Sequence, residues 1–198
     1  MSTDAGRDFA GTAFTLVRHP DSPDVGVHAI DGRLAWQPDG ALTVWYVMRG
    51  DLGRVRIPPP VAPARRDELW RRTCFELFVG HDRDAAYREF NLSPSGEWAA
   101  YAFRDYRERV PLDGIAAPRI QVQTYGGRFE QDVTLPGEDL PAIAPGERWC
   151  VGVSAVLESA DGALAYWALA HAPGKPDFHC RAAFALRFGA GSEREPKR

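Results

Sequence analysis

Four side chains of the types that bind metals lie close together near the C-terminal end of the 198-residue chain. They are His171, Asp177, His179 and Cys180. Zinc sites normally use tighter paired spacings, such as C-x2-C or H-x3-H, and these are absent here. The prolines and the glycine between His171 and Asp177 instead indicate a rigid loop, in which Asp177 and His179 would satisfy backbone amides. We therefore expect a structural loop and no metal site.

Two glutamates, Glu76 and Glu89, are of the residue type that glycosidases use in pairs, with carboxyl groups about 5 Å or about 6.5–9.5 Å apart. Both lie in strand-like segments, whose side chains alternate between two faces. On that alternation Glu76 and Glu89 are expected to project to opposite faces and to share no site. The motifs G-x-S-x-G and G-x-G-x-x-G are also absent. The sequence therefore favours a protein without catalytic activity.

Glu76 has an alternative, purely structural interpretation. It shares a strand face with Cys74 and Phe78, and Arg88 lies on the adjoining segment. Because an unpaired buried carboxylate is costly, a buried pair of Glu76 with Arg88 is as compatible with the sequence as a contact with a ligand.

The composition argues against several classes of partner. With 24 basic and 27 acidic residues the net charge is −3, so no broad positive field for nucleic acid or anionic membranes is expected. The double arginines at 65–66 and 71–72 are too small a cluster to change this expectation. No stretch approaches the roughly 20 apolar residues of a membrane helix, and the first residues do not resemble a signal peptide. We therefore predict a cytoplasmic protein in which Cys74, Cys150 and Cys180 stay reduced.

Segments with a two-residue hydrophobic period dominate the chain, and 16 prolines and 19 glycines divide it into short pieces. About eleven or twelve strands are expected, with one or two short helical turns near 64–70 and 138–141. Because strands do not alternate with helices, the pattern predicts an all-β protein, an antiparallel β-sandwich of jelly-roll or immunoglobulin-like type. Tight turns between strands are expected at Asp31-Gly32, Ser93–Gly96, Gly126-Gly127 and Asp161-Gly162.

The chain length suits one domain, which we place at residues 13–189. The first twelve residues are expected to be flexible. Residues 190–198 lack apolar side chains and are expected to be disordered.

Two stretches carry more than generic strand content. The first spans residues 69–98 and contains LWRRTCFELFV and YREFNLSPSGEW, and the second is YWALAHAPGKPDFH at 166–179. Together they resemble DOMON-like proteins allied to family 9 carbohydrate-binding modules, a superfamily that also includes haem- and sugar-binding DOMON domains. The second stretch is similar to a bacterial DOMON-like subgroup. The resemblance implies a β-sandwich without catalytic machinery of its own.

The resemblance also implies which residues would bind a sugar. In sugar-binding members, tryptophans clamp the ring while a carboxylate and amides hydrogen-bond its hydroxyls, which matches the chemistry of stacking and planar polar contacts. Glu89 stands where such modules can carry an arginine, and Trp167 has the alternative of being a core residue. The positions that correspond are Trp70 as one clamp, Glu76 as the carboxylate, Asn91, Gln121 or Gln123 as the amides, and Trp167 as the nearest candidate for the second clamp.

Two other functions remain open at this point. Haem-carrying DOMON domains use a methionine and a histidine as axial ligands, and Met48 and His171 are of these types. An exposed strand edge could instead pair with another protein chain in a scaffold role. The prediction that we carry forward is a module without a cofactor that binds a small carbohydrate or glycoconjugate, by stacking on Trp70 and hydrogen bonding to Glu76, Asn91 and Gln123.

Overall fold

The computed structural model describes residues 11–144 and 146–188. In this part of the chain the regular structure consists of strands and four single 3-10 turns, and no helix is long and apolar enough to cross a membrane. The prediction of an all-β protein is confirmed. The strands are β1 Thr12–Arg18, β2 Val27–Trp36, β3 Leu42–Gly50, β4 Cys74–His81, β5 Tyr87–Leu92, β6 Trp98–Asp105, β7 Glu108–Val110, β8 Arg119–Tyr125, β9 Arg128–Leu135, β10 Trp149–Glu158, β11 Leu164–Ala168 and β12 Leu186–Phe188. The 3-10 turns are η1 Leu52–Arg54, η2 Leu69–Arg71, η3 Gly137–Asp139 and η4 Arg181–Ala183.

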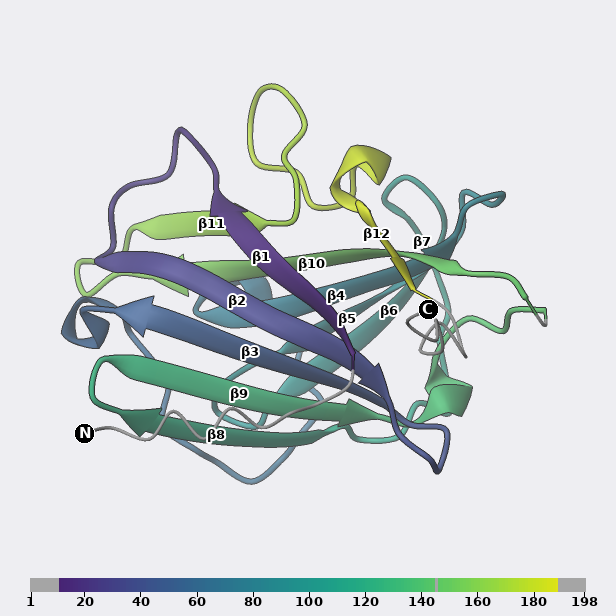
Figure 1. Ribbon diagram of the computed structural model, residues 1–198, viewed down its shortest axis with the longest axis horizontal. Helices are drawn as coiled ribbons and strands as arrows, with labels where there is room; N and C mark the ends of the chain where they lie inside the picture. The colour runs from purple at the N-terminus through teal and green to yellow at the C-terminus, as the bar shows by residue number, and fades with distance from the viewer. Residues whose placement is uncertain (1–10, 145, 189–198) are drawn as a thin grey trace, which may run out of the picture.

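The strands form two packed layers, as the sequence predicts (Figure 1). The hydrogen-bonded order is β7-β6-β5-β4-β10-β11-β1-β2-β3-β9-β8, and β12 pairs with β10. Every neighbouring pair is antiparallel. We call β8-β9-β3-β2-β1 the first layer and β11-β10-β4-β5-β6-β7 with β12 the second layer. The layers are joined where β1 meets β11, through the pairs Val17 with Ala168 and Arg18 with Trp167.

The prediction of a hairpin turn at Asp31-Gly32 is wrong. Residues 27–36 form the single strand β2, and Gly32 pairs with Phe14 of β1 and with Tyr46 of β3. A Cβ atom at Gly32 would lie 2.2 Å from Cζ of Phe14 and 2.3 Å from the carbonyl oxygen of Trp45. The glycine therefore marks a close approach inside a central strand, which is the other common role of glycine in a sheet.

The other predicted turns are confirmed. Gly96, Gly126, Gly127 and Gly162 have φ between +53° and +92° between consecutive antiparallel strands, a conformation that favours glycine. The C-terminal strand is shorter than the sequence pattern indicates, because residues 181–183 form η4 and pairing with β10 begins only at Leu186. Most of the expected flexible segment 1–12 and the expected tail 190–198 lie outside the described residues, although Thr12 already belongs to β1.

The second layer is buried on both faces, and this feature positions the candidate site. Its inner face contributes to the core between the layers. On its outer face η2 and the segment from Phe178 to Phe184 pack against β4, β5, β6 and β10 and form a second apolar cluster. Seven of the eight residues of β4 are therefore buried, and so are all ten of β10. Polar side chains on this outer face lie under a cover of loops.

Candidate functional site

A pocket of 830 Å³ opens on the outer face of the second layer. Its floor comes from strands β4, β5, β6, β10 and β11, and its walls come from the segment before β4, the β6–β7 hairpin and the loop after β11. It is lined by Asp67, Glu68, Trp70, Glu76, Glu89, Tyr101, Phe103, Arg107, Arg109, Val156, Tyr166, Lys175, Pro176, Phe178 and His179.

Glu76 and Glu89 lie on the same face of the sheet, contrary to the expectation of opposite faces. In the register of β4 and β5, Glu76 pairs with Asn91 and Phe78 pairs with Glu89. Directly paired residues of antiparallel strands project to one side, and so do residues two apart along a strand. Glu76 and Glu89 are thus diagonal neighbours, and both line the pocket. The expectation failed because residue numbers give no relative parity until the loop between two strands sets the register.

Glu76 is a nearly buried carboxyl group, with 3 % of its surface exposed. Ser154 of β10 donates a long hydrogen bond to its Oε2 (3.5 Å), and its Oε1 has no hydrogen-bond partner among the described residues. Burial, with the nearby carboxyl of Glu89 as the second cause, raises the pKa of Glu76 well above its ordinary value. A buried acceptor without a donor is uncommon, and here it lines the pocket.

Glu89 is the second buried carboxyl group of the pocket. Asn91 Nδ2 donates to its Oε1 (2.7 Å), and its Oε2 lies 3.7 Å from Nε2 of His179. Burial raises the pKa of Glu89 to about 7, against the opposing effects of the Asn91 hydrogen bond and of Arg107 and Arg109. Glu89 is therefore partly protonated at neutral pH, and the protonation equilibrium of Glu76 is shifted in the same direction.

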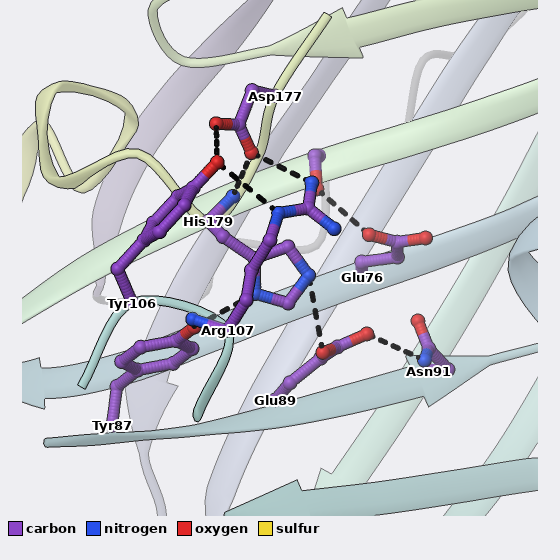
Figure 2. A network of polar contacts seen from close by, with 9 residues as sticks. Glu76, Tyr87, Glu89, Asn91, Tyr106, Arg107, Asp177 and His179 are labelled. Atoms are coloured by element: carbon purple, nitrogen blue, oxygen red, sulfur yellow. Dashed lines mark hydrogen bonds and ion pairs between the residues drawn. The ribbon is translucent and has the colours of Figure 1, made fainter. Parts of the chain in front are cut away.

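The loop between β11 and η4, residues 169–180, covers this face of the sheet, and we call it the covering loop. His179 is held by a network of polar contacts that joins the covering loop to the strands (Figure 2). Its Nδ1 lies 2.8 Å from Oη of Tyr87, and the backbone N–H of Arg107 donates to the same Oη (3.1 Å). We assign Tyr87 as the donor to Nδ1, because its oxygen already accepts from Arg107. The proton of the neutral ring is then on Nε2, on the side of Glu89. Burial, with the charge of Arg107 as the next cause, lowers the pKa of His179 to about 4, so its contact with Glu89 is not an ion pair at pH 7.

Arg107 and Asp177 close this side of the pocket. The guanidinium Nη2 of Arg107 donates to Oδ1 of Asp177 (2.9 Å), and the hydroxyl of Tyr106 donates to Oδ2 (2.8 Å). Asp177 Oδ1 also accepts from the backbone N–H of His179 (3.1 Å). The expectation that Asp177 and His179 satisfy loop amides is confirmed for Asp177 and wrong for His179, whose ring contacts the side chains of Tyr87 and Glu89. Asp177 in addition fastens the loop to the β6–β7 hairpin. Among the described residues no cluster of His, Cys, Asp and Glu could hold a metal ion.

Backbone strain is concentrated at this pocket. Among the described residues other than glycine, only Glu68 and Arg107 have positive φ, at 64° and 55°. Both line the pocket, on opposite walls. Such conformations cost free energy in a residue with a side chain, and they cluster at ligand sites because the surroundings hold them there. The strain therefore agrees with a binding role for the pocket.

The hydroxyl of Tyr87 is expected to stabilise the covering loop. Replacing Tyr87 by phenylalanine leaves Nδ1 of His179 and the N–H of Arg107 without their partner, so the free energy of unfolding should fall by about 1 to 2 kcal/mol. Urea denaturation measures this change. Tyr106→Phe is the matched control. Because Tyr106 is exposed, this substitution should lower the free energy of unfolding by less than about 0.5 kcal/mol. Equal losses in the two variants would contradict this account of the network.

The wall formed by the segment before β4 carries an exposed aromatic side chain. Trp70 lies in η2 with 45 % of its surface exposed, and the guanidinium of Arg71 stacks on its ring at 5.2 Å. Beside it, the hydroxyl of Tyr101 donates to Asp67 (2.7 Å), and the guanidinium of Arg109 lies 4.0 Å from the ring centre of Tyr101. An exposed indole ring therefore lines the same pocket as the buried polar groups of its floor.

The structure brings together only part of the predicted sugar site. Trp70 and Glu76 line the pocket, and Asn91 supports it from below through its hydrogen bond to Glu89. Gln121 and Gln123 are exposed on β8, at the far edge of the first layer, and Trp167 is buried in the core between the layers. These three residues do not contribute to the pocket.

The haem ligands suggested by the sequence are not brought together either. Met48 is fully buried in the core between the layers. His171 lies on the outer side, where its Nε2 is 2.8 Å from the carbonyl oxygen of Val17 and its ring contacts His19 and Phe178. Arg88, which the sequence offered as an alternative partner of Glu76, instead donates to the carbonyl oxygen of Asp139 (2.6 Å).

Sequence reasoning missed most of the remaining lining residues. Tyr101 is separated from Glu89 along the chain, and only the β5–β6 register makes them direct partners. Arg107 is brought in by the turn of the next hairpin, and Lys175 and His179 by the covering loop. The one usable signal was that β4 and β10 are apolar on both faces, which predicts a cover over the second layer.

Comparisons with known proteins identify the fold. No protein-family model matches the chain, and no curated protein matches its sequence. A suggested carbohydrate-binding protein from Bacteroides uniformis ATCC 8492 is similar in structure, with a TM-score of 0.63 and 17 % identity over 90 % of this chain and 87 % of that one.

A family 9 carbohydrate-binding module from Caldicellulosiruptor kristjanssonii, solved with two different sugars, is also similar in structure to this chain. In complex with glucose it gives a TM-score of 0.51 and 11 % identity over 85 % of this chain and 81 % of that one. In complex with cellotriose it gives a TM-score of 0.53 and 10 % identity over 95 % of this chain and 88 % of that one. At these identities the likeness establishes the fold, and the chain therefore has the β-sandwich fold of family 9 carbohydrate-binding modules.

Proposed function

We propose that the pocket on the second layer binds a small carbohydrate without changing it chemically. The observation that carries the proposal is the combination, in one pocket, of the exposed ring of Trp70 with the buried Oε1 of Glu76, which has no hydrogen-bond partner in the described part of the chain. A sugar has an apolar face of C–H groups and a rim of hydroxyl groups. The ring of Trp70 offers the apolar surface for the first, and the carboxyl groups of Glu76 and Glu89 offer acceptors for the second.

The size and polarity of the pocket support the same proposal. Its volume of 830 Å³ is in the range of small-molecule sites. The aromatic rings of Tyr101, Phe103, Tyr166 and Phe178 provide apolar lining, while charged side chains project from several directions. Such a mixture of flat apolar surface and a few convergent polar groups suits a ligand that is itself amphipathic.

The structural neighbours add independent support. The family 9 module from Caldicellulosiruptor kristjanssonii was solved with glucose and with cellotriose, so this fold can hold a monosaccharide or a short glucan. We extend this ability to the present chain as part of the proposal. Of the residues expected to bind the sugar, the proposal retains Trp70, Glu76 and Asn91, adds Glu89, and leaves out Gln121, Gln123 and Trp167.

A thermal-unfolding screen tests the proposal. A ligand that binds only the folded state stabilises it by about 2.7 kcal/mol at a hundredfold excess over Kd, and the midpoint rises accordingly. We expect a rise with glucose, cellotriose or another sugar of a panel that includes amino sugars and uronic acids. No rise with any sugar, or a rise with haemin alone, would contradict the proposal.

A further inference from the structure

The charged groups around the floor of the pocket are largely paired with one another. Arg107 binds Asp177 at 2.9 Å, Arg109 lies 3.9 Å from Asp67, and on the rim Arg71 binds Glu68 at 2.8 Å. Other titratable side chains facing the site are the neutral His179, the buried thiol of Cys74, and the hydroxyl groups of Tyr87, Tyr101 and Tyr166.

Three charged groups are left over from this pairing. They are Glu76 and Glu89 on the floor and Lys175 on the covering loop, which has no ion pair or hydrogen bond among the described residues. When both glutamates are ionised, their two negative charges on the floor outweigh the single positive charge of Lys175. The guanidinium of Arg107 donates its hydrogen bond to Asp177, and its charge lowers the pKa of both glutamates without a hydrogen bond to either among the described residues.

The two carboxyl groups also have unused acceptor capacity. Ionised carboxylates accept hydrogen bonds and donate none. Within residues 11–144 and 146–188, Glu76 receives one long bond at Oε2 and none at Oε1, and Glu89 receives one from Asn91. Oε1 of Glu76 has no hydrogen-bond partner among the described residues, so a ligand that supplies several donors and a positive charge would complete the arrangement.

We propose that the pocket prefers a sugar with a free amino group, whose ammonium ion binds between Glu76 and Glu89. This inference rests on the proposed function and names the ligand class of the same pocket. An ammonium group has three N–H donors and a full positive charge, so it satisfies the open acceptors and compensates the buried negative charge. The rest of the sugar ring stacks on Trp70.

An ammonium ion that binds between the two glutamates must displace protons from them. Because the pKa of Glu89 is about 7 and that of Glu76 is also raised, binding of an ammonium group near pH 7 should release on the order of one proton. A neutral sugar brings no charge and should release far less. Proton release is therefore a signature that stacking alone would not produce.

Calorimetric titration at pH 7 tests the inference, with glucosamine, 6-amino-6-deoxyglucose, glucose and N-acetylglucosamine as probes. At least one amino sugar should bind about tenfold or more tightly than glucose, because hydrogen bonds to charged groups are stronger than neutral ones. N-Acetylglucosamine, which lacks the charge, should lose the advantage. Repeating the titration in two buffers of different ionisation enthalpy measures the protons released.

Variants locate the effect. Glu76→Gln and Glu89→Gln keep the shape of the side chain, and each should reduce the ratio of the glucose Kd to the amino-sugar Kd towards one. Glu130→Gln is the matched control, since it removes a buried carboxyl group from β9 of the first layer and should leave the ratio unchanged.

The outcomes separate the inference from the proposed function. If glucose binds and neither amino sugar binds more tightly, the inference is wrong and the proposed function stands. If the preference persists when both glutamates are replaced, the ammonium ion binds elsewhere and the inference is also wrong. If no sugar binds at all, both fail.

Discussion

Replacing Trp70 by alanine is expected to weaken sugar binding by about 30-fold. A central aromatic side chain in a binding site contributes about 2 kcal/mol or more, and 2 kcal/mol corresponds to about this factor in Kd. The fold should be almost unaffected, because Trp70 is 45 % exposed and its main contact is the stacked guanidinium of Arg71. The free energy of unfolding should therefore change by less than about 1 kcal/mol. Calorimetry and urea denaturation measure the two effects.

Trp45 provides the matched control for this experiment. It is a half-buried tryptophan on β3 of the first layer, and it does not line the pocket. Trp45→Ala should leave the sugar Kd within about twofold of the wild type, whatever it does to stability. If Trp70→Ala retained full affinity while folded, Trp70 would not be the stacking surface and the proposed site would be wrong.

The difference in free energy of unfolding between the Glu89→Gln variant and the wild type is expected to shift by about 3 kcal/mol in favour of the variant as the pH rises from 4.5 to 8. Burial raises the pKa of Glu89 from 4.5 to about 7 in the folded protein. The folded state then holds a proton that the unfolded state has lost, so the contribution of Glu89 to the free energy of unfolding falls as the pH rises through this interval. Each pKa unit corresponds to about 1.4 kcal/mol, which gives the stated magnitude. Glutamine cannot ionise, and its amide oxygen can still accept from Asn91.

Urea denaturation of both proteins at several pH values measures this difference. The comparison with the variant is necessary because other carboxyl groups act in the opposite sense. Hydrogen bonds and ion pairs lower the pKa of Glu97 and Asp161, for example. The stabilisation that these carboxylates give to the folded protein is lost as the pH falls and they become protonated. A difference between variant and wild type that did not change with pH would show that Glu89 is ionised and well solvated in the folded protein.

The alternation of side chains was sufficient to predict the fold class. Apolar side chains alternate along most strands, and glycines at 96, 126–127 and 162 mark turns that the structure contains. Gly32 shows the limit of this reasoning. A turn glycine and a glycine at a close approach give the same local pattern, and only the partner strands, with the ring of Phe14 against Gly32, distinguish them.

The candidate site could be predicted only where it lies within one strand or beside it. Trp70 and Glu76 are six residues apart and reach the pocket together. Glu89 was assigned to the wrong face, because the β4–β5 register depends on the intervening loop. Gln123 was expected to approach the same site, yet its strand pairs at the far end of the other layer. Contacts between distant segments follow from the strand order, which local patterns do not contain.

An NMR titration of the indole N–H signals tests the central claim most directly. The chain has six tryptophans, and the missing signal in the spectrum of Trp70→Ala assigns that of Trp70. As a sugar that raised the unfolding midpoint is added, the account predicts that the Trp70 signal moves to saturation while that of Trp45, on the other layer, stays in place. A binding sugar that moves the Trp45 signal and leaves that of Trp70 unchanged would place the site on the other layer and contradict the account.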